Sequence, residues 1–182
     1  MNIIGLDVSA DRLAYAHIMG GNLTAGGEWD CKGAFPDKEI LKALGPWLID
    51  YPPESVIFCL EINLRPLMVN KGALSPRLVK NYMRSRWVEG RLMQILGFPE
   101  PVMIERKRGG YFIPCRSKFH SLQARSEGTR KGSDAKKRRR ARMEAIYQIK
   151  HKFSQDIIDA LAIAHECEVA LKTGFIEKGA EQ

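Results

Sequence analysis

The sequence lacks several features that would assign it to a common class of protein. It has no run of about 18 apolar residues, so no segment is predicted to cross a membrane. No basic segment precedes its first apolar stretch, so we expect no signal peptide and a cytoplasmic location. The four cysteines form no Cys-x-x-Cys pair, and the four histidines show no Ser or Cys partner pattern. These absences argue against a zinc site and against a nucleophilic triad.

Basic residues are concentrated in one part of the chain, whose net charge is +8. Residues 104–152 hold 16 Lys or Arg and 4 Asp or Glu, whereas the rest of the chain holds 13 and 17. Such a segment favours phosphate contacts with a nucleic acid, although a solvated basic helix face is the alternative interpretation. The residues of its densest run that we interpret as phosphate contacts are Lys137, Arg138, Arg139 and Arg140.

The apolar pattern predicts an α/β fold in a single domain that spans residues 1–182. The predicted strands are 2–9, 13–19, 23–30, 55–61 and 101–105. The predicted helices are 37–49, 75–96, 134–149 and 154–172. The first three strands should form an antiparallel meander and the last two should be parallel, because helices separate them. We therefore expect a five-stranded mixed sheet that is flanked by helices.

Residues 109–132 are rich in Gly, Ser and Arg, and we interpret them as a DNA-facing loop insertion rather than a core element. Tyr111, Phe112 and Phe119 stand among its basic residues. These aromatic side chains could stack on unpaired bases, or they could form a small satellite core under the loop. The basic residues of the insertion that we expect at DNA are Arg116, Lys118, Arg130 and Lys131.

Four carboxylates occupy positions where an unpaired charge is costly. Asp7 lies within an apolar strand, and Glu61 ends another. Asp156 and Asp159 open an otherwise apolar helix, three residues apart and therefore on one face. Acids at the start of a helix often only stabilise the helix by interacting with its dipole, which is the alternative interpretation of this pair. Because a buried carboxylate needs a partner charge or a metal, we expect the four acids to share a cation.

A site made of four carboxylates suits divalent cations. Mg²⁺ prefers oxygen ligands, so a site without His or Cys fits two Mg²⁺ ions, with Mn²⁺ as a substitute. In such a site one ion activates a water, and the other stabilises the leaving oxygen of a phosphodiester. Together with the basic segment, the carboxylates indicate a metal-dependent nuclease.

The order of these acids resembles a known family. The motif Asp-Ile-Ile-Asp-Ala-Leu-Ala-Ile-Ala at 156–164, after Ile-Ile-Gly-Leu-Asp at 3–7 and the strand that ends in Glu61, is similar to the RuvC family of Holliday junction resolvases. That family has the ribonuclease H-like fold. The resemblance covers about residues 2–105 and 133–170, and the motif at 156–164 is its most specific part. It implies a homodimer that cuts four-way DNA junctions by paired symmetric nicks, with these residues as metal ligands: Asp7, Glu61, Asp156 and Asp159.

The resemblance also implies further residues at the DNA. Lys136 matches a catalytic lysine of the family, although an ordinary phosphate contact is its alternative role, and Lys107 matches another lysine. The family has an aromatic wedge shortly after the strand glutamate, whereas this chain has Leu64 followed by Arg65. Leu64 would therefore open the junction as an apolar wedge.

In the same resemblance, the helix at 75–96 packs against its two-fold mate. Met83, Trp87 and Met93 lie near the edge of its apolar stripe and could supply the dimer contact. Their alternative role is burial against the sheet. The small size of the chain and its departure at the wedge suit a phage-type resolvase, which would act in the host cytoplasm.

Two other functions fit the same residues. A different ribonuclease H-like nuclease, acting on RNA–DNA hybrids or flaps, would use the same four acids without a dimer. A non-catalytic binder of branched nucleic acid could keep the fold, but carboxylates repel phosphate unless a metal is present. The intact set of acids therefore favours a nuclease. The sequence identifies no helicase or recombination partner.

Overall fold

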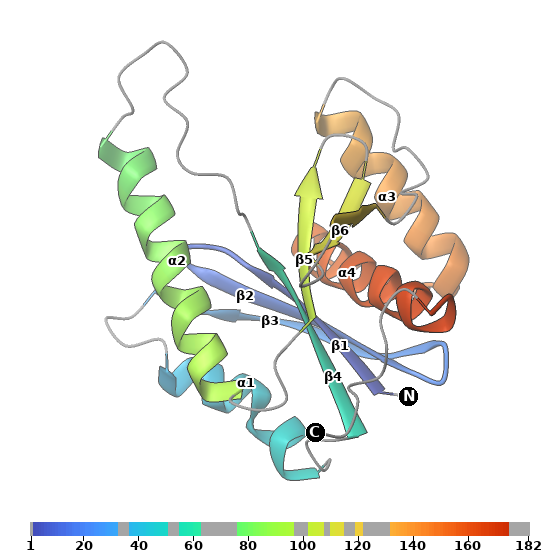
Figure 1. Cartoon of the computed structure of the whole chain (residues 1–182), viewed down its shortest axis with the longest axis horizontal. Coiled ribbons are helices and arrows are strands. Elements are labelled where there is room, and N and C mark those ends of the chain that lie inside the picture. The colour runs from blue at the N-terminus through green and yellow to red at the C-terminus, as the bar shows by residue number, and fades with distance from the viewer. Residues whose placement is uncertain are drawn as a thin grey trace.

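The structure is a mixed sheet with helices on both faces, as the sequence predicts (Figure 1). The computed structural model describes residues 2–32, 37–50, 55–62, 76–96, 102–107, 110–114, 119–121 and 132–174. Ser75 suits the N-cap position and Gly97 the C′ position of the helix predicted at 75–96, and both lie outside the described residues.

The sheet begins with the predicted antiparallel meander. Its strands are β1 (Asn2–Val8), β2 (Arg12–Met19) and β3 (Asn22–Asp30). Gly20 and Gly21 form the turn between β2 and β3, with φ angles of 59° and 85° that glycine adopts without a steric penalty. β1 is buried from Ile3 to Leu6, as expected of a central strand that is covered on both faces.

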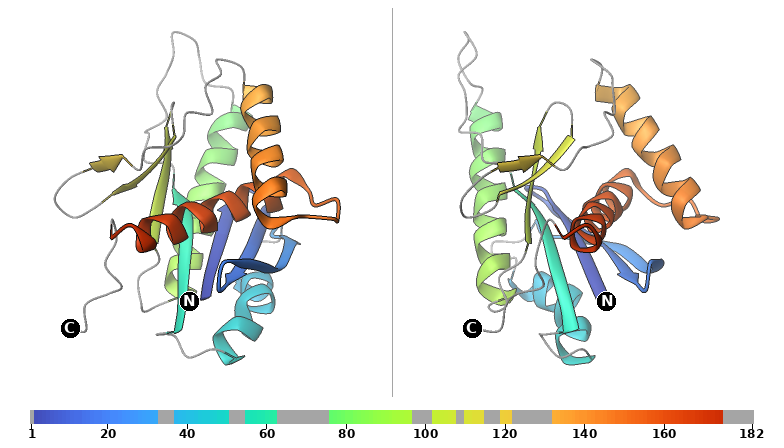
Figure 2. Two further views of the ribbon diagram at one scale, coloured as in Figure 1. Left: turned by 90° about the vertical axis from the view of Figure 1, so that its right-hand side faces the viewer. Right: turned by 45° about the vertical axis from the view of Figure 1, so that its right-hand side comes forward.

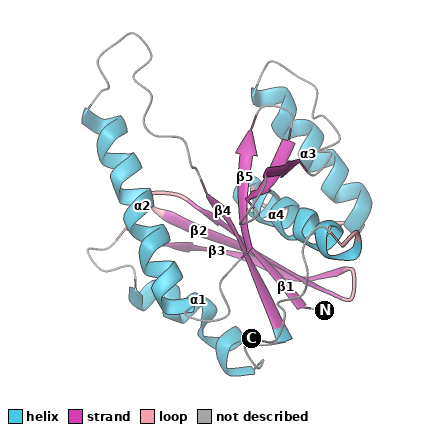
Figure 3. Ribbon diagram, viewed as in Figure 1, coloured by secondary structure: helices cyan, strands magenta, loops and turns pink. Residues whose placement is uncertain are grey.

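Two parallel strands continue the sheet from β1. β4 (Val56–Ile62) pairs with β1, and β5 (Val102–Lys107) pairs with β4. The strand order of the described residues is β3-β2-β1-β4-β5-β6-β7, and Figure 3 labels β1 to β5 of this sheet. The mixed arrangement of a meander followed by parallel strands is therefore confirmed, but the predicted number of five strands is not.

The additional strands lie in the segment that we interpreted as a loop insertion. β6 (Gly110–Pro114) is antiparallel to β5, and β7 (Phe119–Ser121) is antiparallel to β6. The Gly, Ser and Arg content of the segment favoured a loop. The aromatic and β-branched residues of Tyr111–Ile113, however, are typical of a strand. The loop interpretation is therefore wrong for these two short stretches.

Helices cover the two faces of the sheet. The described helices are α1 (Asp37–Asp50), α2 (Pro76–Leu96), α3 (Gly132–Tyr147) and α4 (Gln155–Lys172). α1 and α2 pack on one face around a cluster that includes Leu6, Leu44 and Leu92. α4 packs on the other face, with α3 against it (Figure 2). Because side chains alternate along a strand, Leu6 faces α1 and α2, whereas Gly5 faces α4.

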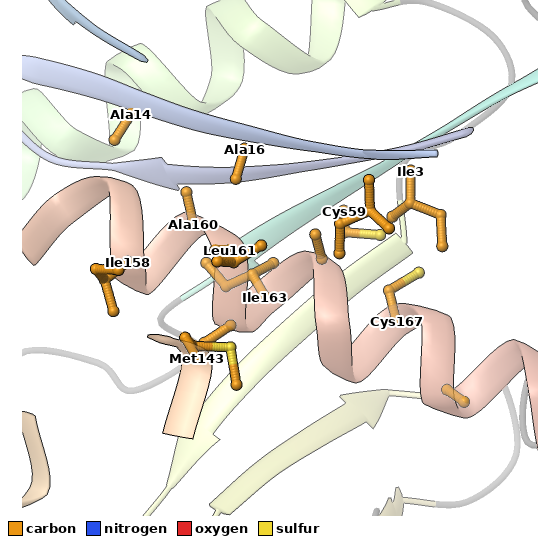
Figure 4. Packing of buried hydrophobic residues seen from close by; sticks show 14 residues of the cluster. Ile3, Ala14, Ala16, Cys59, Met143, Ile158, Ala160, Leu161, Ile163 and Cys167 are labelled. Carbon is orange, nitrogen blue, oxygen red and sulfur yellow. The ribbon is translucent and has the colours of Figure 1, made fainter. Parts of the chain in front are cut away.

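Gly5 allows α4 to approach β1 closely. A Cβ atom on Gly5 would lie 2.1 Å from the carbonyl oxygen of Ala160 and 2.7 Å from the amide nitrogen of Ala164. Small side chains also line the neighbouring contact, where Ala160 lies beneath Ala14 and Ala16 of β2 (Figure 4). This contact fixes the first turns of α4, which carry two of the predicted site acids, relative to the carboxyl end of β1.

Cys31, Cys59 and Cys167 are buried and free, and Cys115 lies outside the described residues. Burial raises the pKa of the Cys59 thiol well above its usual value, and the neighbouring Cys167 adds to the rise. Within the described ranges, none of the helices combines the length and the apolar character that crossing a membrane requires.

Candidate active site

Asp7 and Glu61 lie beside one another at the carboxyl ends of two neighbouring parallel strands. In the register of β1 and β4, Leu6 pairs with Leu60, so the next residue of each strand is one of the two acids. The leucines are fully buried, whereas both acids are partly exposed. Both acids line one hollow of about 190 Å³. The structure thus brings together the two site acids that the sequence placed on strands.

One face of α2 completes this hollow. Besides the two acids, its lining consists of Val8, Tyr82, Ser85, Arg86 and Glu89. The four α2 residues are spaced by one, three or four positions, which places them on one side of the helix. None of them was predicted as a site residue, because the sequence indicated only packing and dimer contacts for this helix.

Glu89 is a third acid at the hollow. Its Oε2 accepts a hydrogen bond from Nη1 of Arg86 at 2.7 Å. Burial raises the pKa of the Glu89 carboxyl, Arg86 opposes that rise, and the negative charge of Glu61 adds to it. The interaction with Glu61 indicates that negative charge accumulates in the hollow, which favours the binding of a cation there.

Asp156 lies in the first turn of α4. Ser154 caps this helix, because its Oγ accepts a hydrogen bond from the N–H of Ile157 at 3.2 Å. The side chain of Asp156 is 40% exposed and lies 3.8 Å from Nη1 of Arg12 on β2. Asp156 is therefore partly open to solvent, and an ion pair of this length holds its side chain only weakly.

Asp159 has a different environment, although it is only one turn away. Its Oδ1 accepts hydrogen bonds from Nη1 of Arg139 at 2.5 Å and from Nε2 of Gln155 at 2.9 Å. The two side chains of the ion pair are 4% and 5% exposed. A guanidinium from α3 thus neutralises this carboxylate in the arrangement that the structure describes.

The four predicted acids are of a residue type that binds divalent cations, and two of them line the same hollow. Asp7 and Glu61 offer carboxylate oxygens to one hollow, which fits the ligand preference of Mg²⁺. Among the residues that the structure describes, no three His, Cys, Asp or Glu side chains lie close enough to hold one ion together. The two strand acids therefore fit the ion, whereas Asp159 already has one carboxylate oxygen bound to Arg139 and Gln155.

The basic residues of α3 are divided between two faces of the helix. Lys136, Lys137 and Arg138 are exposed, whereas Arg139 is buried. The prediction that Arg139 contacts DNA does not fit this position, because its ion pair holds it inside the protein. Arg140 is partly buried, and its Nη1 donates a hydrogen bond to a backbone carbonyl of the segment before α4 at 3.0 Å.

Several predicted contacts lie where the structure gives no description. The predicted DNA contacts outside the described residues are Leu64, Arg65, Arg116, Lys118, Arg130 and Lys131. The backbone of Lys107 belongs to β5, but its side chain is not among those described, and the same holds for the side chain of Met93 in α2.

Known structures share this arrangement of strands and helices. RuvC of Thermus thermophilus, in complex with a Holliday junction substrate, aligns with a TM-score of 0.60 and 14% sequence identity over 96% of each chain. The chain has the RuvC resolvase fold. A further structure of Thermus thermophilus RuvC aligns with a TM-score of 0.57 and 16% identity, covering 96% of this chain and 97% of RuvC. In sequence, the chain matches no family model and no curated protein.

The RuvC fold also occurs in a viral protein that is similar to this chain. The resolvase of Fowlpox virus, in complex with its substrate Holliday junction DNA, aligns with a TM-score of 0.53 and 14% identity over 94% of this chain and 99% of the resolvase. The resemblance that the sequence suggested is therefore confirmed for the fold. In this RuvC fold, the hollow that holds Asp7 and Glu61 lies between β1, β4 and α2.

Proposed function

We propose that this chain is a metal-dependent, structure-selective endodeoxyribonuclease that resolves four-way DNA junctions by paired symmetric nicks within a single domain, residues 1–182. The observation that carries the proposal is the pair of Asp7 and Glu61 in one hollow at the ends of β1 and β4. Two resolvases of the same fold are described in complex with Holliday junction DNA. Acids that attract cations, on a chain with a basic helix that attracts phosphate, suit phosphodiester hydrolysis.

The proposed metal is Mg²⁺, two ions in each site, with Mn²⁺ able to replace it. Asp7 and Glu61 would hold it, and Asp156 and Asp159 would be the further ligands. Bound ions would supply an activated water and stabilise the leaving oxygen. The ion pair with Arg139 holds Oδ1 of Asp159 and orients this carboxylate.

The exposed face of α3 is the proposed track for the DNA backbone. Lys136 would act near the scissile phosphate, and Lys137 and Arg138 would contact phosphates on either side. Leu64 remains the proposed wedge. The other proposed phosphate contacts are Arg65, Lys107, Arg116, Lys118, Arg130, Lys131 and Arg140.

Paired nicks need two active sites, and α2 offers a surface for a homodimer. Val79, Met83 and Trp87 are 36%, 62% and 38% exposed, and their spacing of four residues places them along one side of the helix. Exposed apolar side chains in a row are typical of a protein–protein contact. The proposed dimer pairs α2 with its two-fold mate, and its proposed location is the cytoplasm of a bacterium or of a phage host.

One observation favours a second candidate function, the non-catalytic binding of branched nucleic acid. Asp159 is bound to the buried Arg139, and the described acids do not gather in groups of three. If the ion pair stays closed when DNA binds, the chain would hold junctions without cutting them. A nuclease for hybrids or flaps differs from both candidates in its substrate.

Cleavage of a labelled, immobile four-way junction in Mg²⁺ tests these proposals, beside linear duplex, flap and RNA–DNA hybrid. We expect paired nicks that disappear with Asp7→Asn or Glu61→Gln, while junction binding is retained or tightened because a repelling charge is removed. Asp30→Asn is a matched control, because the Asp30 side chain is 59% exposed at the end of β3 and lies outside the hollow. This variant should cut as the wild type does.

The pattern of cleavage separates the candidates. Cutting of hybrid or flap alone would retain the metal site and replace the substrate. Tight junction binding without cutting, in Mg²⁺ and in Mn²⁺, would support the non-catalytic binder instead.

A further inference from the structure

The hollow contains one cation among its described lining residues, Arg86 of α2. Its guanidinium is held on two sides. Nη1 donates a hydrogen bond to Glu89 at 2.7 Å, and Cζ lies 5.3 Å from the centroid of the Tyr82 ring. An ion pair and a cation–π contact together restrict a side chain that is otherwise flexible. Arg86 is thus a positioned cation in the wall of the hollow that Asp7 and Glu61 share.

The other terminal nitrogen of this guanidinium is not satisfied. Nη2 of Arg86 is buried and has no hydrogen-bond partner among the described residues. Buried donors in folded proteins almost always have a partner, so an unsatisfied one at a candidate site calls for an explanation. The side chain as a whole is 30% exposed, and Arg86 is one of the residues that line the hollow. An acceptor that enters the hollow would complete its hydrogen bonding.

The chemistry of the hollow identifies the kind of acceptor. Its described acids are Asp7, Glu61 and Glu89, and Arg86 already opposes the rise that burial causes in the pKa of Glu89. A phosphodiester placed against the Asp7–Glu61 pair presents two non-bridging oxygens. Nη2 of Arg86 can donate to one of these oxygens while Nη1 stays on Glu89, and the guanidinium carries a permanent positive charge.

We infer that Arg86 binds a non-bridging oxygen of the phosphate that is cut, and that Glu89 and Tyr82 are positioning residues for Arg86. The inference rests on the proposed function, because it requires a phosphodiester to react at the Asp7–Glu61 hollow. A guanidinium at this place stabilises the negative charge that develops on the phosphate oxygens during the reaction. Arg86 is then a catalytic residue on α2, in addition to the acids on the strands and on α4.

Arg86→Gln tests the contact by single-turnover cleavage in Mg²⁺ and by junction affinity in Ca²⁺. Cleavage at saturating DNA should fall about 100- to 1,000-fold, as when one donor to a developing oxyanion is removed. Affinity should fall less than about tenfold, because one phosphate contact is a small part of junction binding. Arg86→Lys should not restore the rate, because an ammonium lacks the planar fork. Arg77→Gln is the control, since Arg77 is exposed on the same helix and outside the hollow.

A second readout separates phosphate contact from a structural role. The wild type first maps the scissile phosphate, and a methylphosphonate then replaces the phosphate at that position. In Ca²⁺ the wild type should bind this DNA more weakly than the unmodified DNA, whereas Arg86→Gln should bind the two about equally. If Arg86→Gln alone does not fold because Glu89 is left buried without its partner, the double variant Arg86→Gln with Glu89→Gln removes that charge and allows the same comparison.

The outcomes distinguish this inference from the proposed function. If the junction is cut and the methylphosphonate weakens Arg86→Gln and the wild type by the same factor, Arg86 does not touch the phosphate and only this inference is overturned. If only flap or hybrid is cut, yet Arg86→Gln shows the expected pattern on that substrate, the junction proposal fails and this inference stands. If the wild type cuts none of the four substrates, both are overturned.

Discussion

Nη1 of Arg139 on α3 lies 2.5 Å from Oδ1 of Asp159 on α4, and both side chains are almost completely buried. The pair joins the two helices beside Met143, which lies one turn after Arg139 and is fully buried in the cluster around α4. It also connects a proposed metal ligand with the helix that is proposed to bind DNA. A movement of α3 on DNA would therefore change the partner of Asp159 directly.

Arg139→Ala should lower the free energy of unfolding by about 3–5 kcal/mol, because it leaves the buried Asp159 carboxylate without its partner charge. Arg138→Ala alters the preceding residue, which is exposed, and should change stability by less than about 0.5 kcal/mol. Urea unfolding of the purified variants measures both values. Arg139→Met combined with Asp159→Leu should recover most of the stability, since no charge is then buried alone.

An equal and small effect of Arg139→Ala and Arg138→Ala would contradict the buried pair. It would mean that Arg139 points into solvent, and the prediction of a phosphate contact at Arg139 would then be restored.

Gly5→Ala should be poorly tolerated, because its Cβ would lie 2.1 Å from the carbonyl oxygen of Ala160. The backbone of β1 or α4 must then shift, and we expect a destabilisation of at least about 1–3 kcal/mol. Gly90→Ala is the control, since a Cβ on Gly90 in α2 meets no atom within 4 Å. This change in a helix should stabilise the protein by about 0.5–1 kcal/mol. Thermal unfolding measures both, and an unchanged Tm for Gly5→Ala would refute the close contact of β1 with α4.

The strand acids could be predicted from the sequence for a simple reason. Asp7 and Glu61 each follow a leucine that ends a buried apolar run, and parallel strands that are neighbours bring such ends together. The start of α4 was also predicted within one residue, since the helix expected at 154–172 begins at Gln155, after Ser154 as its cap. In both cases the sequence pattern within one strand or helix was sufficient, since the spacing of its apolar residues already indicates where the buried part of that strand or helix begins or ends.

Other parts of the site depend on contacts between elements and could not be predicted. Within the run Lys136–Arg140 the residues are chemically alike, and only Met143 and Tyr147, four and eight positions after Arg139, mark the face that Arg139 shares. Arg86 was missed for a related reason. Its role depends on which face of α2 lies over the ends of β1 and β4, and the apolar spacing of this helix does not determine that.

The exposed face of α3 should set the salt dependence of junction binding. Lys137→Ala combined with Arg138→Ala should weaken binding and reduce the slope of log Kd against log salt concentration by about 0.9 for each phosphate that the protein no longer neutralises. Lys38→Ala combined with Lys42→Ala removes the same charge from α1, where both lysines are exposed, and should leave the slope unchanged. Titrations in Ca²⁺ at several salt concentrations measure the slopes. Equal slopes for the two double variants would place the exposed face of α3 away from the DNA.

The proposed dimer surface on α2 should be sensitive to a single charge. Met83→Glu would bury an unpaired carboxylate in the proposed interface, at a cost of about 3 kcal/mol or more, which raises the dimer Kd at least about 100-fold. Ile49→Glu is the control, since Ile49 is 84% exposed on α1, away from this surface. In sedimentation equilibrium, the wild type and Ile49→Glu should be dimers, whereas Met83→Glu should be largely monomeric.

The monomer should nick one strand of a junction without the paired second cut, because each subunit supplies one active site. A wild type that is monomeric, or a Met83→Glu variant that dimerises as tightly as Ile49→Glu, would remove α2 as the dimer contact while leaving the site around Asp7 unaffected.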